Sequence, residues 1–97
     1  MKIDIQRLRN LTTGLIHTKM AHIYEDLELI AGKSGVMTHN LTGLSSACKP
    51  WLREHVTDAR FWDGKFDTTH TGEIELPNPT AKDLKAMFKR YHKRISL

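Results

Sequence analysis

The sequence predicts a mainly α-helical domain: a small bundle of three to four helices, with a long irregular segment and a possible short β element before the C-terminal helix. Two observations predict this class. Apolar residues recur at spacings of three, four and seven in the first half of the chain and near its end, as on one face of a helix. Between these stretches, residues 57–79 lose this spacing. They contain two pairs typical of turns, Asp63-Gly64 and Thr71-Gly72.

The first predicted helix begins at Thr12 or Thr13, either of which can cap it, after a short opening turn around residues 4–8. Because its apolar residues return to one side of a helix, we expect them to face the core. Gly32 ends this helix, and residues 33–35 form a turn. The predicted core stripe consists of Leu15, Ile16, Met20, Ile23, Tyr24, Leu27 and Ile30.

The second predicted helix starts after Thr38 or Asn40 and contains a proline. Pro50 has no backbone N–H, and its ring disfavours helical geometry in the preceding residue. We therefore expect a break near Lys49 and a new short helix with Pro50 in its first turn.

The last predicted helix opens at Thr80, with Asp83 three residues later as in a capping box. Before it, residues 73–76 alternate between polar and apolar like a brief strand, with no obvious partner in the sequence. The apolar face of this helix carries Leu84, Met87, Phe88 and Tyr91.

Composition narrows the class of protein. The 97 residues have room for one domain, residues 1–97, and no apolar run approaches the roughly 18 residues of a membrane span. Charges interrupt the first residues, so a secretory signal is not expected, and we predict a cytoplasmic protein without membrane contact. Cys48 is the only cysteine, which excludes an internal disulfide and a zinc site built on paired thiolates.

The sequence shows no pattern typical of catalysis or of a cofactor. Cys48 occupies an apolar helical position, and no nucleophile with an ordered base can be picked out, so we expect a core thiol and no enzyme. His17 and His22 are five residues apart, which separates them by about 140° around a helix. They cannot bind one metal ion together, and no metal site or cofactor is predicted.

The predicted binding residues combine hydrogen-bond donors with an aromatic anchor. Aromatic residues beside arginine dominate binding hot spots, and the tryptophan next to the Asp63-Gly64 turn is the expected exposed anchor. A turn at Pro50 would bring two cations beside the start of the second helix, where an anionic group is favoured. The predicted site is Thr38, His39, Lys49, Arg53 and Trp62.

Two alternatives use other chemistry. The net charge is +4, and cations crowd the C-terminal helix, so a nucleic-acid interface is possible there. Its predicted residues are Lys85, Lys89, Arg90, Lys93 and Arg94. The other alternative is a sponge for a small ligand or nucleotide, in which the donors of the predicted site hold an anion.

Three short motifs resemble a known family. They are residues 11–14 (Leu-Thr-Thr-Gly), 38–41 (Thr-His-Asn-Leu) and 48–52 (Cys-Lys-Pro-Trp-Leu). In these motifs the chain resembles a family of small, largely uncharacterised proteins encoded by tailed bacteriophages and prophages. The resemblance implies a phage accessory protein in the host cytoplasm. We therefore expect a non-catalytic protein that binds and inhibits a host macromolecule, most plausibly a component of antiviral defence, as an anti-CRISPR does.

Overall fold

A computed structural model of the chain describes residues 1–32 and 38–95, with the side chains of residues 1–32 and 40–92. It is mainly helical, with four α-helices and one small antiparallel sheet in these residues, which confirms the predicted class. The predicted turn at residues 33–35 lies outside the described residues. The elements are β1 (Lys2–Asp4), α1 (Ile5–Thr12), α2 (Met20–Ala31), α3 (Thr38–His55), the 3-10 helix η1 (Ala59–Trp62), β2 (Glu73–Glu75) and α4 (Ala81–Ile95).

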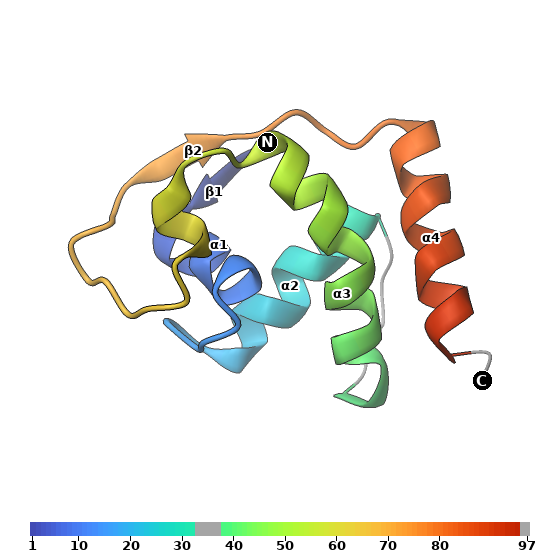
Figure 1. Cartoon of the computed structure of the whole chain (residues 1–97), viewed down its shortest axis with the longest axis horizontal. Helices are drawn as coiled ribbons and strands as arrows, with labels where there is room; N and C mark the ends of the chain where they lie inside the picture. The colour runs from blue at the N-terminus through green and yellow to red at the C-terminus, as the bar shows by residue number, and fades with distance from the viewer. Residues whose placement is uncertain (33–37, 96–97) are drawn as a thin grey trace.

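Three helices surround the core, and the fourth extends it. α1, α2 and α3 pack against one another, and α4 packs along α3 at one end of the molecule (Figure 1). η1 and the loop that follows it lie at the other end, beside α1. Every one of these helices contributes fully buried apolar side chains to the core, among them Leu8, Leu27, Ile30, Leu44, Leu52, Phe61 and Met87.

Helix α1 follows β1 directly and occupies Ile5–Thr12, so the predicted short turn at residues 4–8 is wrong. Asp4 caps this helix, because its Oδ2 accepts a hydrogen bond from the backbone N–H of Arg7 at 3.1 Å. The prediction that a helix begins at Thr12 or Thr13 is also wrong, since α1 ends at Thr12. Thr13 instead donates its hydroxyl to the Arg9 carbonyl at 2.8 Å, as a residue at a helix end does.

A loop, not a helix, occupies residues 13–19. Gly14 has a positive φ of 78°, which interrupts helical geometry. The Asn10 side chain then holds the loop, because its Oδ1 accepts hydrogen bonds from the backbone N–H groups of His17 and Thr18 at 2.7 and 3.2 Å. The predicted core stripe is therefore divided. Ile16 in the loop and Met20 at the start of α2 are exposed, whereas the stripe from Ile23 onward packs inward from α2.

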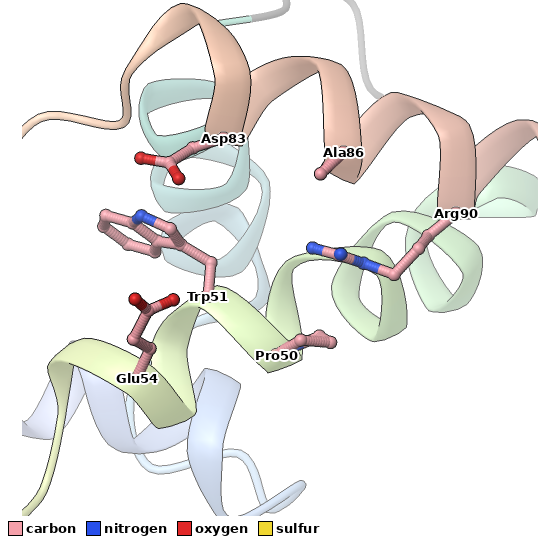
Figure 2. Close-up of a pocket in the computed structure, with 6 residues that line it drawn as sticks. All are labelled: Pro50, Trp51, Glu54, Asp83, Ala86 and Arg90. Carbon is pink, nitrogen blue, oxygen red and sulfur yellow. The ribbon is translucent and has the colours of Figure 1, made fainter.

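Helix α3 runs without a break through Pro50, so the predicted interruption near Lys49 is wrong. A proline inside a helix removes one N–H donor and crowds the preceding turn. Here α4 supplies a donor at that turn, because Arg90 Nε donates to the Ala47 carbonyl at 2.8 Å. Figure 2 shows Arg90 reaching from α4 toward the Pro50 turn of α3. This bond joins α4 to the Pro50 turn, but it does not replace the bond that the proline removes, which in an uninterrupted helix would go to the Ser46 carbonyl.

The predicted brief strand is present, and its partner is the N-terminal segment. β1 and β2 pair antiparallel, with Ile3 opposite Ile74. The pairing continues where the Leu76 N–H donates to the Met1 carbonyl at 2.8 Å. The sheet therefore ties the start of the chain to the segment before α4.

Helix α4 begins with the predicted capping box. The Thr80 N–H donates to Asp83 Oδ2 at 2.8 Å, and the Asp83 N–H donates to Thr80 Oγ1 at 3.1 Å. The hydrogen bond from the Thr80 backbone lowers the pKa of Asp83. Met87 and Tyr91 are buried, which confirms the predicted apolar face.

Candidate binding groove

The predicted donor cluster does not assemble in the structure. Because α3 is continuous, Lys49 lies ten residues beyond His39, or roughly 15 Å along the helix axis. The prediction that these residues meet is wrong, since it depended on a turn at Pro50. The side chains of Thr38 and His39 lie outside the described ones. Lys49 and Arg53 remain one helical turn apart on one side of α3.

Trp62 is not the exposed anchor that the sequence predicted. It is half-buried, and its Nε1 donates to the Val56 carbonyl at 2.8 Å. The Arg53 guanidinium lies over its ring, 4.3 Å from the centroid, in a cation–π contact. The turn pair after Trp62 suggested exposure, but the 3-10 helix turns the indole back onto α3.

The exposed aromatic residue is Phe66. Its side chain is 66% exposed, and its ring meets His17 edge-on with centroids 5.1 Å apart. This contact joins the loop after η1 to the loop at residues 13–19. An aromatic residue inside a polar, turn-rich stretch was the sequence signal for it.

An open groove lies between the 13–19 loop, the start of α2 and the first half of α3. Its volume is about 300 Å³. Ile16 and Met20 border it and are 53% and 41% exposed, although the sequence placed both in the core. The other lining residues are Asn10, Gly14, Ile23, Leu41, Thr42, Ser45, Ser46 and Lys49.

The groove has a cationic side and no carboxylate among its lining residues in the described part of the chain. Lys49 lines it directly, and Arg53 follows one turn later on α3. Two of the three acidic residues of α2 form ion pairs away from the groove. Arg7 donates to Asp26 at 2.8 Å and to Glu25 at 3.0 Å, which turns both carboxylates toward α1. The groove is therefore apolar with a positive edge.

A buried arginine supports the neighbouring loop. Arg9 of α1 is fully buried, and its guanidinium donates to the carbonyls of Arg60 and Lys65 at 2.7 and 2.5 Å and to His70 Nδ1 at 2.9 Å. Because a guanidinium can only donate, His70 Nδ1 accepts and its proton sits on Nε2, 3.8 Å from Asp58. Burial, followed by the nearby arginines, lowers the pKa of His70. No pattern in the sequence marks Arg9 as buried, because an arginine in a short helix normally points to solvent.

A second, smaller cavity of about 110 Å³ lies between α3 and α4. Figure 2 shows the Trp51 indole between the carboxylates of Asp83 and Glu54, with Arg90 at the other end. It is smaller than the about 300–1,000 Å³ of typical ligand sites, and Arg90 is already bound to the Ala47 carbonyl. We interpret it as a packing junction between the two helices.

Cys48 is a core residue, as the sequence predicted. It is buried, its Sγ lies 3.9 Å from Met87 Sδ, and burial raises the pKa of the thiol to about 11. Within the described residues, histidine, cysteine and acidic side chains form no group of three that could hold a metal ion. None of the helices described is long and apolar enough to cross a membrane.

The cations of α4 divide into two kinds. Lys85 and Lys89 are exposed, as is Lys82, and their spacing of three and four residues puts them on one side of the helix. Arg90 is not available in the same way, because it donates to the Ala47 carbonyl of α3. The predicted residues Lys93 and Arg94 have side chains outside the described ones.

Fold and groove together define a small, mainly helical domain with an exposed apolar groove and a positive edge. Residues 4–62 match the family described as a domain of unknown function (DUF7736), and because they make up more than half of the chain, the protein belongs to this family. No curated protein and no solved structure matches it. All residues lining the groove fall within residues 4–62, whereas α4 and its lysines lie outside.

Proposed function

We propose that this protein is a phage-type accessory protein that binds a host macromolecule and inhibits it by occluding its surface, without catalysis. The partner we favour is a protein component of antiviral defence. The binding surface in this proposal is the groove between the 13–19 loop, α2 and α3.

The observation that carries the proposal is the exposure of Ile16 and Met20 at a groove beside Lys49. Apolar side chains exposed at a concave surface with a polar rim are typical of protein-binding sites. The groove also lies wholly in the segment that defines the family. A surface of this kind binds a partner without any reacting group.

The small-ligand alternative has less support. It required the donors near residue 39 to meet Lys49 and Arg53, and the unbroken α3 helix separates them. The nucleic-acid alternative has one favourable observation, the exposed lysines of α4, and its test follows in the Discussion.

The test is copurification from host cells, with mass spectrometry of the bound proteins. We expect wild-type protein to retain a host protein whose activity it inhibits, and Ile16→Ser/Met20→Gln to lose both effects. The matched control is Leu29→Gln, which changes an apolar side chain that is exposed elsewhere on α2. Equal retention by wild type and the Ile16→Ser/Met20→Gln variant would contradict a role for the groove.

A further inference from the structure

The groove offers space of a particular size and kind. Its volume of about 300 Å³ is at the lower limit of ligand sites, so it suits one large side chain and its neighbours better than a long cofactor. The walls that would contact such a side chain are apolar: Ile16, Met20, Ile23 and Leu41. An apolar group entering here would remove exposed apolar surface from water on both molecules.

The charged lining residue of the groove is a cation, and two more exposed cations lie nearby in the described part of the chain. Lys49 lines it, Arg53 follows one turn later, and Lys19 is exposed at the start of α2. Asp26, the buried acidic residue of α2, is bound by Arg7 of α1. An uncompensated positive edge attracts and orients a negatively charged partner segment.

The amide side chain of the groove, Asn10, is not available to a small anion. It is already engaged with the backbone of His17 and Thr18 and with the Thr18 hydroxyl at 2.7 Å. Bound phosphate would also leave Ile16 and Met20 in water. A polypeptide that carries both an apolar side chain and a carboxylate satisfies both parts of the surface.

We infer that the groove recognises an acidic segment of a partner protein in which a large apolar side chain lies close to Asp or Glu. The apolar side chain enters between Ile16, Met20 and Leu41, and the carboxylates face Lys49 and Arg53. This inference rests on the proposed function, since it names the chemistry of the partner at the same surface.

The test is selection of short random peptides on the immobilised full chain, followed by sequencing. We expect the enriched peptides to combine leucine, methionine or an aromatic residue with net negative charge. Recovery of these peptides should fall about tenfold on Lys49→Glu/Arg53→Glu. The matched control is Lys85→Glu/Lys89→Glu, with the same two charge reversals at exposed positions of α4, which should retain them.

Several outcomes would overturn the inference. Enriched peptides that are neutral or basic, an absence of enrichment over a blank surface, or equal recovery by the Lys49→Glu/Arg53→Glu variant would each do so. If charge reversal unfolds the protein, as a thermal melt would show, Ile16→Ser/Met20→Gln tests the apolar half at exposed positions. Displacement of the peptides by a short duplex DNA would instead place nucleic acid in the groove.

Failure of the inference is distinguishable from failure of the proposed function. If the selected peptides are acidic and apolar and depend on the groove, but copurification retains no host protein, the proposed function is contradicted and the inferred chemistry of the groove is supported. A retained and inhibited host protein whose contacting segment is basic would keep the function and reject the acidic segment.

Discussion

His70 is the residue at which burial and charge work most clearly against protonation. Its ring is buried against Phe61, with centroids 4.5 Å apart, and Arg9 donates to its Nδ1. Protonation would place a second positive charge, and a second donor, against the Arg9 guanidinium. The pKa of His70 is therefore lower than its ordinary value, and the loop held by Arg9 depends on a neutral ring.

We expect the free energy of unfolding to decrease as the pH falls below about 6.5, the ordinary pKa of histidine. In that window the unfolded chain binds more protons than the folded chain, so stability rises with pH. Urea melts between about pH 7.5 and 5 measure this slope. His70→Gln keeps an acceptor for Arg9 but cannot titrate, so its slope should be shallower, the remainder coming from His17, whose pKa burial also lowers.

The same slope in His70→Gln and wild type would contradict this role of His70. Asp58 does not contribute to the slope of the unfolding free energy in this pH range. Its pKa is lowered to about 2, chiefly by hydrogen bonds from Arg60, so its contribution is lost only below its ordinary value of 3.8. The two groups thus act in separate pH windows.

At the scale of the element, α3 continues through a proline and is joined to α4 at the same turn. Pro50 leaves the Ser46 carbonyl without its helical donor, and Arg90 of α4 donates to the next carbonyl, that of Ala47. Pro50 itself is exposed, so its ring contributes little to the core.

We therefore expect Pro50→Ala to increase the free energy of unfolding by about 1–3 kcal/mol, since proline is about 3 kcal/mol less favourable than alanine in a helix interior. Arg90→Met should decrease it by about 1–2 kcal/mol, since the variant loses the hydrogen bond to the Ala47 carbonyl. Chemical denaturation of both single variants measures the two changes. Loss of stability in Pro50→Ala would show instead that the rigid proline turn is required.

At the scale of the whole molecule, two of the surfaces that carry positive charge are candidates for binding a partner. One is the groove edge at Lys49 and Arg53, and the other is the face of α4 that carries Lys82, Lys85 and Lys89. These surfaces come from different helices, and only the first lies in the segment that matches the family.

We expect the α4 lysines to contact duplex DNA only weakly and without sequence preference. With three phosphates neutralised, the logarithm of the association constant should fall with the logarithm of salt at a slope of about −2.7. Fluorescence anisotropy with a labelled duplex over a salt series measures the slope, and Lys85→Glu/Lys89→Glu should abolish binding. A flat salt response, or unchanged binding by that variant, would remove the nucleic-acid alternative.

Local patterns predicted much of the secondary structure, but they failed where distant residues decided the outcome. The Thr80–Asp83 capping box and the Gly32 helix end depend on neighbours in the chain, and both are present. The predicted break at Pro50 is absent, and α4 packs against that turn of α3 through Arg90, 43 residues away from Ala47. The prediction that Trp62 is exposed also failed, because its indole is bound to the Val56 carbonyl and lies under the Arg53 guanidinium.

The sequence by itself determined the helical class, the apolar face of α4, the buried thiol and the brief strand, because periodicity and capping are local properties. Only the tertiary structure decided which apolar residues of the predicted core stripe are exposed. Gly14 and the Asn10 side chain hold residues 13–19 as a loop, so Ile16 and Met20 border an open groove. Burial depends on what packs against a residue, and that partner is chosen by the whole fold.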